Sequence, residues 1–171
     1  MNKKKLIPII GIAAVISLII ICIFFLLINR EEKNTSKQWV FRQYEYLDTI
    51  NNYTENMDDV FALYSINGIT EQTFQEEISI LKKELEVIKT IYENDKKEFD
   101  ISPTSYSYAS KRGIDGFENI FVHLEKLLNE VSDGNERISS EIVYIYLSYQ
   151  TLIEEDINEY LTSYILLKYN E

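Results

Sequence analysis

The stretch FQEEISILKKELEVIKTIYENDKKEF, residues 74–99, has the most regular pattern in the chain. Its apolar residues recur at spacings of three and four, with one longer gap that spans Asp95: Phe74, Ile78, Leu81, Leu85, Ile88, Tyr92 and Phe99. Such spacing places these side chains on one face of an α-helix, whereas a half-buried strand would alternate at every second residue. The stretch therefore predicts a long amphipathic helix whose apolar face needs partner helices.

The same spacing predicts further helices on both sides of this stretch. The quoted helix is extended to residues 70–99, because Thr70 can cap its first turn, where Glu71 is favoured by the helix dipole. A preceding helix at about 38–66 ends at Asn67-Gly68, a pair typical of helix ends. A last helix at 135–169 follows the turn signal Ser132-Asp133-Gly134-Asn135.

The start of the remaining helix has two interpretations. Ser102-Pro103 is a favoured beginning and predicts a helix at 103–131. However, residues 105–116, SYSYASKRGIDG, are polar and hold two glycines, each of which costs about 1 kcal/mol in a helix interior. Asp115 with Glu118 offers a later start, which would leave a long connecting loop. The sequence does not decide whether 103–114 is helix or loop.

These four helices predict an all-α domain. Five glycines and two prolines in 171 residues are too few for a turn-rich β fold. Because the connections are short, consecutive helices should run antiparallel in an up-down-up-down four-helix bundle. The last helix should then return beside the start of the first one, which places its apolar end, YLTSYILLKY at 160–169, next to Trp39 and Phe41.

A membrane anchor is predicted before the bundle. Residues 6–28, LIPIIGIAAVISLIIICIFFLLI, form 23 consecutive uncharged positions, and about 20 suffice to span a bilayer. We expect residues 1–5 to be a short basic cytoplasmic terminus, 29–37 a polar juxtamembrane linker, and 38–171 the extracytoplasmic bundle. The orientation rests on the Lys3-Lys4-Lys5 cluster before the run and on Glu31-Glu32 after it.

Net charge and cysteine content exclude several classes of protein. The chain has 17 basic and 28 acidic residues, and residues 1–28 contain three lysines and no acid. The strongly acidic remainder would repel a phosphate backbone, so we expect no binding to nucleic acid. The only cysteine, Cys22, lies in the apolar run, which excludes a disulfide framework.

Residues for catalysis or metal binding are scarce. His123 is the only histidine, whereas di-iron helical bundles need two Glu-x-x-His pairs. No nucleophile motif or phosphate-binding glycine loop occurs. We therefore predict no enzyme, no cofactor and no metal site. His123 is expected at the edge of the core, and Asp156 projects onto the apolar stripe of the last helix, where it would be a buried polar group.

Contact surfaces are predicted instead. On a helical projection referred to Ile145, Leu161 and Ile165 point away from the core, and Tyr144, Tyr146 and Tyr149 cannot all face inward. The candidates for contact with a partner or with the membrane interface are Trp39, Phe41, Tyr144, Tyr146, Leu161, Ile165 and Tyr169. The end far from the membrane should form an acidic tip of Asp58, Asp59, Glu71, Glu76, Glu77, Asp133 and Glu136.

The leading hypothesis for function is a non-enzymatic single-pass membrane protein. Its acidic extracytoplasmic bundle would bind a protein partner, as an accessory subunit of an envelope complex or as an immunity or exclusion factor. The alternative is a ligand-sensing bundle. In outline the architecture resembles the four-helix ectodomains of bacterial chemoreceptors. Those receptors use a second transmembrane helix and a signalling domain that these 171 residues do not show, so such a sensor would work through a partner membrane protein.

Overall fold

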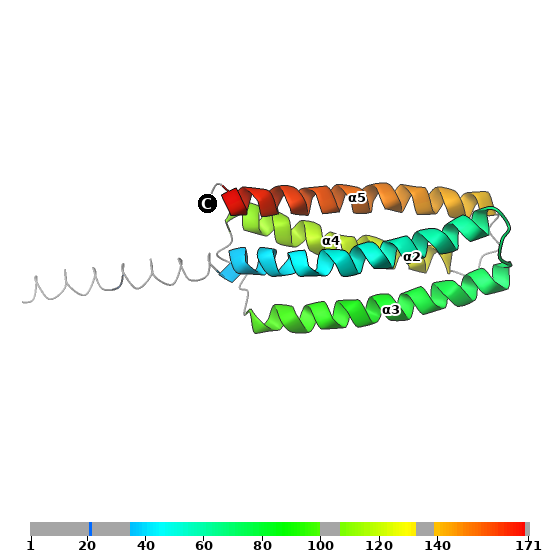
Figure 1. Ribbon diagram of the computed structural model, residues 1–171, viewed down its shortest axis with the longest axis horizontal. Coiled ribbons are helices and arrows are strands. Elements are labelled where there is room, and N and C mark those ends of the chain that lie inside the picture. Colours follow the sequence, from blue (N-terminus) through cyan, green and yellow to red (C-terminus); the bar gives the residue numbers. More distant parts are fainter. Residues whose placement is uncertain (1–20, 22–34, 100–106, 133–138, 170–171) are drawn as a thin grey trace, which may run out of the picture.

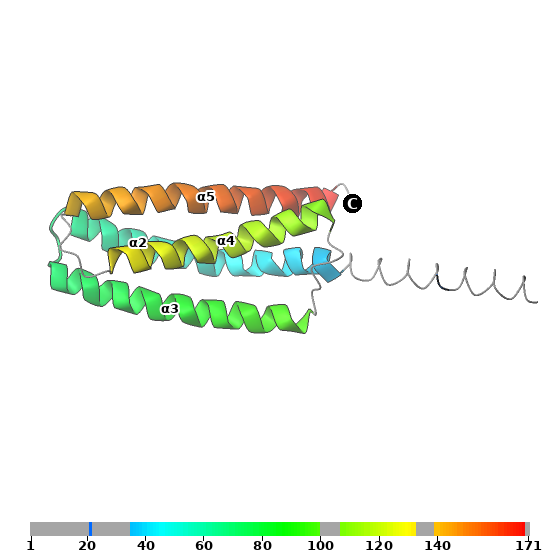
Figure 2. The same ribbon diagram turned by 180° about the vertical axis from the view of Figure 1, so that it is seen from behind.

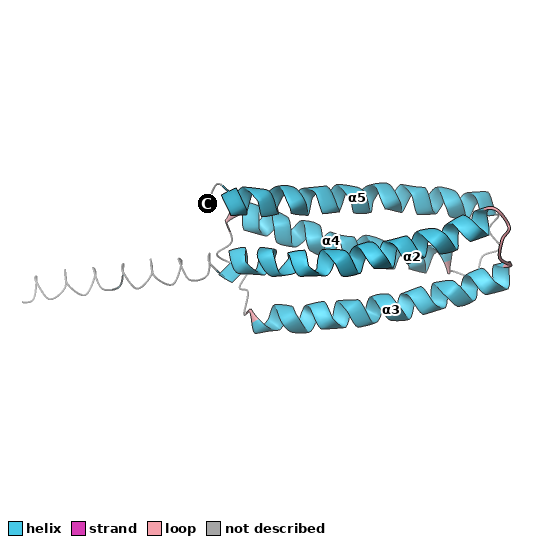
Figure 3. Ribbon diagram, viewed as in Figure 1, coloured by secondary structure: helices cyan, strands magenta, loops and turns pink. Residues whose placement is uncertain are grey.

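A computed structural model describes residues 21, 35–99, 107–132 and 139–169 of the chain. These residues form four long helices and no strand, which confirms the all-α prediction (Figure 3). The helices are α2 (Leu47–Ser65), α3 (Glu71–Glu98), α4 (Tyr108–Val131) and α5 (Ser139–Tyr169). Residues 35–43 are also helical and continue into α2 through one 3-10 turn, η1 (Tyr44–Tyr46).

The four helices lie side by side with their long axes nearly aligned (Figures 1 and 2). The last turns of α5 lie beside residues 35–46, as predicted from the short connections. Two contacts fix this pairing: the Tyr160 hydroxyl donates a hydrogen bond of 2.7 Å to the Val40 carbonyl oxygen, and the Phe41 and Tyr164 rings meet edge to face at 5.3 Å. The carboxyl end of α5 therefore closes the bundle over the start of the first helix.

Local sequence signals explain most of the helix ends. The Thr70 hydroxyl accepts a hydrogen bond of 3.2 Å from the Thr73 amide, so the predicted cap of α3 is confirmed. After α2, Asn67 takes the left-handed conformation with φ 55°, and the Gly68 amide bonds back to the Leu63 carbonyl at 2.7 Å. Both bonds satisfy backbone groups that a helix end would otherwise leave unpaired.

Two helix starts differ from the residues at which the sequence analysis placed them. α4 begins at Tyr108, where the Ser107 hydroxyl caps the Ser110 amide at 3.1 Å. This start lies between the two alternatives at residues 103 and 115, and residues 100–106 lie outside the described part of the chain. Residues 35–37 of the expected linker are helical, and Ser36 is buried. The predicted start of the last helix at 135 lies within 133–138, which are also outside the described residues.

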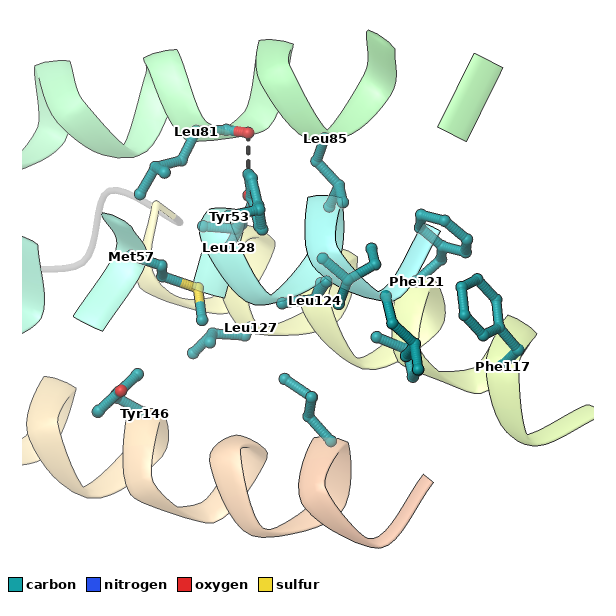
Figure 4. Close-up of a cluster of buried hydrophobic side chains, with 14 of the residues drawn as sticks. Tyr53, Met57, Leu81, Leu85, Phe117, Phe121, Leu124, Leu127, Leu128 and Tyr146 are labelled. Atoms are coloured by element: carbon teal, nitrogen blue, oxygen red, sulfur yellow. Dashed lines mark hydrogen bonds between the residues drawn. The ribbon is translucent and has the colours of Figure 1, made fainter. Parts of the chain in front are cut away.

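The core follows the predicted stripes closely. In α3 the buried residues are Phe74, Ile78, Leu81, Leu85 and Tyr92, all from the quoted stretch. Figure 4 shows Leu81 and Leu85 facing side chains of α2, α4 and α5. Tyr44 stands at helical spacing between the buried residues Val40 and Leu47 but is 48% exposed, because the 3-10 turn η1 changes the angle between successive residues at this point. Its ring instead stacks on Tyr164 at 4.7 Å.

The tightest helix contact lies between α4 and α5, at two glycines. A Cβ atom placed on Gly113 would come within 3.1 Å of the Ser163 Cβ and 3.3 Å of Val40. One placed on Gly116 would lie 3.3 Å from both the Asp156 carbonyl oxygen and the Tyr160 nitrogen. The two glycines therefore let the backbones of α4 and α5 approach closely, and this packing offsets their low helix propensity.

The predicted anchor lies almost entirely outside the described residues. Within the described ranges, no helix is both long enough and apolar enough to cross a bilayer. Apart from Ile21, the apolar run 6–28 lies outside those ranges, so the anchor stays a sequence-based prediction.

Candidate interaction surfaces

The seven predicted contact residues divide between the core and the surface. Trp39 is completely buried and Tyr146 is 8% exposed, so both are core residues and their assignment to a surface was wrong. Trp39 lies against Tyr92 and Phe99, with ring centroids 5.2 and 5.0 Å away. Phe41 and Leu161 are half-buried, whereas the remaining three are exposed: Tyr144, Ile165 and Tyr169.

Leu161 does not point away from the core, as the helical projection of α5 predicted. It packs against the core, whereas Ile165 is 53% exposed as predicted. The buried stripe of α5 consists of Ile142, Tyr146, Ile153, Asp156, Tyr160, Ser163 and Leu167. On a helical projection with about 100° between successive residues, the centre of this stripe lies about 50° from Ile145, the residue taken as reference. Leu161 therefore lies on the flank of the stripe, and only Ile165 points fully outward.

Charged residues are segregated between the two ends of the bundle. We define the basic end as residues 35–44, 96–99, 107–113 and 161–169; it holds seven basic residues and one acid, Glu98. We define the acidic end as residues 58–77, 128–132 and 140–146; within these described ranges it holds seven acids and no basic residue. The predicted acidic tip falls at this end, except for Asp133 and Glu136, which lie outside the described residues.

Part of the acidic end has a structural role. The Tyr64 hydroxyl donates to the Glu71 carboxylate, and the Tyr146 hydroxyl donates to Asp58. The phenol of each tyrosine stays buried or half-buried while its hydroxyl reaches a charged acceptor at the surface. Asp59, Glu76 and Glu141 are exposed and remain available to set the potential of this end.

An open groove of about 370 Å³ lies between α4 and α5, toward the acidic half of the bundle. Its lining includes His123 and Glu130 of α4 and Tyr144, Tyr149 and Leu152 of α5. The Tyr149 hydroxyl donates to Glu130 at 3.1 Å, whereas Tyr144 is 73% exposed at the edge. The groove thus combines apolar surface with a few polar groups held by hydrogen bonds.

His123 and Asp156 form a pair next to this groove. The His123 Nδ1 lies 2.6 Å from the Asp156 Oδ2, and the side chains are 20% and 10% exposed. Burial raises the pKa of the Asp156 carboxyl, and its hydrogen bond with His123 opposes this increase. The sequence placed each residue correctly, His123 at the edge and Asp156 on the core stripe, but it did not indicate that they meet.

Near the basic end lies a polar network that the sequence analysis did not predict. Asp95, the residue that interrupts the apolar pattern of α3, accepts hydrogen bonds from the Tyr46 hydroxyl at 2.7 Å and from the Arg42 Nε at 2.8 Å. The Tyr46 bond, followed by the Arg42 bond and charge, lowers the pKa of the Asp95 carboxyl. Nearby, the buried Gln43 Nε2 donates to the Tyr92 hydroxyl at 2.7 Å. These contacts fix how residues 35–46 sit against α3.

A second open groove, of about 460 Å³, separates α2 from α3. It is mostly apolar, and Val87 and Ile88 line one side. No exposed aromatic residue lies among the residues that line it, in contrast to Tyr144 at the α4–α5 groove. Metal binding has no support in the described ranges, where no group of three His, Cys, Asp or Glu side chains could hold an ion.

Comparison with known proteins gives no functional information. No protein-family model matches the chain, no curated protein matches its sequence, and no solved structure matches its fold. The functional argument therefore rests on the chain's own residues.

We expect burial of the Asp156 carboxylate to reduce stability at neutral pH, and its hydrogen bond with His123 to offset part of this cost. The folded-state pKa of Asp156 is raised above its unfolded value of about 3.8, so its contribution to stability is lost as the pH rises through the folded pKa. Asp156→Asn should therefore leave the chain at least as stable at pH 7, because the amide can still bond to Nδ1. His123→Leu should instead destabilise by about 1–3 kcal/mol, because a buried carboxylate loses its partner.

Trp39 provides the readout for this test, because it is the only tryptophan and is fully buried. Unfolding of the full chain in mild detergent can be followed by its fluorescence at neutral pH and near pH 4. An Asp156→Asn chain that is clearly less stable than the parent at neutral pH would contradict the prediction.

Proposed function

We propose that this protein is a single-pass membrane protein with no enzymatic activity, whose acidic helical bundle lies outside the cell and binds a protein partner. The protein would act as an accessory subunit of an envelope complex or as an immunity or exclusion factor. The observation that carries the proposal is the α4–α5 groove with the exposed Tyr144 at its edge.

Three properties of this groove support a protein partner. Aromatic residues are enriched at protein interfaces because they bury a large area with little loss of conformational freedom. Tyr144 is accompanied in the lining by Leu152, which is 39% exposed. Lys126 and Glu130 balance each other in the lining, so it is the neighbouring acidic end whose potential would attract a partner that carries basic residues beside its apolar contact residues.

A ligand-sensing bundle is less well supported. It would need polar side chains that face an enclosed cavity and lack partners within the protein. Asp156 is instead hydrogen-bonded to His123, and the groove beside them is open to solvent.

The membrane part of the proposal rests on the sequence of residues 6–28 and on the charge segregation of the bundle. The uncharged run ends at Ile28, close to the basic end, which begins at residue 35. Basic residues near a bilayer are attracted by anionic headgroups, whereas the acidic end would be repelled and would point away.

The proposal can be tested by crosslinking intact cells with a reagent that cannot cross the membrane. A partner should be captured without lysis if the bundle lies outside. The double variant Tyr144→Lys with Leu152→Lys should reduce the captured partner at least tenfold, because it places charges in the apolar contact that repel a basic partner. The matched control, Ile80→Lys with Val87→Lys, changes two exposed apolar residues of α3 that are 46% and 59% exposed. It should capture the partner as the parent does.

Circular dichroism of both variants checks that the helices are intact. Capture that is unaffected by the groove variant, or that is lost equally in the control, would contradict the assignment of the groove. Capture that appears only after lysis would contradict the outside location.

A further inference from the structure

The basic end presents cations and apolar side chains together. Of its seven basic residues, Arg42, Lys96 and Arg112 form ion pairs with Asp95, Glu118 and Glu159. The other four form no ion pair with any described residue: Lys37, Lys97, Lys111 and Lys168. They come from residues 35–43, α3, α4 and α5, so each helix contributes to this end a lysine that forms no ion pair within the described part of the chain.

Five large apolar or aromatic residues are exposed beside these lysines. They are Tyr44 at 48%, Tyr108 at 82%, Ile165 at 53%, Leu166 at 40% and Tyr169 at 72%. Two of the lysines also lie over aromatic rings: Lys37 is 5.8 Å from the Phe41 ring centre, and Lys168 is 5.5 Å from that of Tyr164. Tyrosine and lysine together are typical of the membrane–water interface, where a ring needs an apolar side and a wet side.

The length of chain before the bundle limits how far this end can lie from a bilayer. Seven peptide steps separate Ile28, the last residue of the uncharged run, from Thr35, the first residue of the described helix. At most about 3.6 Å per residue, these steps reach about 25 Å. The basic end is therefore held at a high effective concentration next to any bilayer that the run crosses.

We propose that the basic end docks on the surface of the bilayer that carries the anchor, with its lysines on anionic lipid headgroups and its exposed tyrosines and aliphatic residues at the interface. This inference rests on the membrane anchor of the proposed function. It explains why α5 is apolar on nearly all sides at its carboxyl end: the side away from the core faces lipid.

Docking has a consequence for the α4–α5 groove. α5 has 31 residues and is about 45 Å long at 1.5 Å per residue. A bundle that stands on its basic end would hold the acidic end about that far above the bilayer. The groove would then face the space beyond the headgroups, where a partner can reach it.

The test uses the full chain with Cys22→Ser, reconstituted in vesicles, and one fluorescent dye on an introduced cysteine. Thr162→Cys reports on the basic end and Glu76→Cys on the acidic end, and both positions are exposed. A lipid with a quencher in its headgroup measures proximity to the bilayer. Quenching at position 162 should exceed that at position 76 at least fivefold in vesicles that contain phosphatidylglycerol, and should fall in pure phosphatidylcholine or in high salt.

Two charge-reversal variants separate docking from simple tethering. Lys111→Glu with Lys168→Glu should weaken docking at least tenfold and lower the quenching at position 162 toward that at position 76. The matched control, Lys83→Glu with Lys126→Glu, makes the same change in charge at exposed lysines away from the basic end and should leave the quenching unchanged.

The outcomes distinguish this inference from the proposed function. Vesicles that retain the chain but show the same quenching at both positions, in either lipid and in either variant, would overturn docking and leave the anchor intact. A chain that does not float with the vesicles would overturn the anchor and the docking together.

Discussion

We expect the bundle to remain folded up to about pH 10 and to be unfolded at pH 12. Among the tyrosines in the described part of the chain, seven have a raised pKa, with burial as the main cause. The pKa of Tyr46 and that of Tyr64 are raised to about 12, and burial also raises those of Tyr53, Tyr92, Tyr146, Tyr149 and Tyr160. Tyrosines with a raised pKa therefore occur in all parts of the core.

The sign follows from proton binding. A tyrosine whose folded-state pKa is raised above its unfolded value of about 10 keeps its proton longer in the folded chain. The stability that depends on this proton is fully present below pH 10 and is lost as the pH rises further. Four of these hydroxyls also donate to carboxylates, those of Tyr46, Tyr64, Tyr146 and Tyr149, so ionisation would place two negative charges together.

Absorbance of tyrosinate and circular dichroism of the full chain in detergent measure this transition. The two signals should change together between pH 10 and 12. Tyr53→Phe should reduce by one the number of protons released when the chain unfolds in this pH range. Tyrosines that all titrate near pH 10 while the bundle stays folded would contradict the burial seen in the structure.

Gly116→Val should lower the free energy of unfolding by about 2–3 kcal/mol. The added side chain would meet the backbone of α5 at Asp156 and Tyr160, where a Cβ atom alone is already 3.3 Å from the nearest atoms. Backbone cannot rotate away as a flexible side chain can, so α4 and α5 must separate. Tyr160, one of these two contact residues, also donates the hydrogen bond to Val40, which should weaken when the helices separate.

The effect of Gly116→Ala on the free energy of unfolding distinguishes a close helix contact from helix propensity alone. In a helix that lacked the close contact, Gly116→Ala would stabilise by about 1 kcal/mol through helix propensity. Against α5 it should give no such gain. Asp115→Val places the same β-branched side chain on the exposed side of α4 and should cost less than about 1 kcal/mol. Trp39 fluorescence during chemical unfolding measures all three, and a stabilised Gly116→Val chain would rule out the close contact.

The candidate surfaces could be predicted only in part. The acidic tip and the basic residues at the opposite end follow from helix order and antiparallel packing, because these determine which segments share an end. Tyr144 as an outward tyrosine follows from the turn of about 100° per residue. Trp39 and Tyr146 could not be placed, because whether an aromatic residue is covered depends on the helix opposite it. The sequence of α5 offers apolar residues on nearly every side.

What the sequence determined by itself is local: the number and type of the helices, the apolar face of residues 74–99, the cap at Thr70 and the stop at Asn67-Gly68. Each depends on spacing along one helix or on backbone groups within a single turn. The tertiary structure decided which faces meet. Gly113 and Gly116 weaken an isolated helix but allow α4 to approach α5, and Asp95, which interrupts a stripe, accepts hydrogen bonds from Tyr46 and Arg42. His123 and Asp156, 33 residues apart, meet for the same reason. Periodicity fixes the direction of a side chain about its own helix axis, but the residue that it contacts depends on the separation, rotation and axial offset of the neighbouring helix.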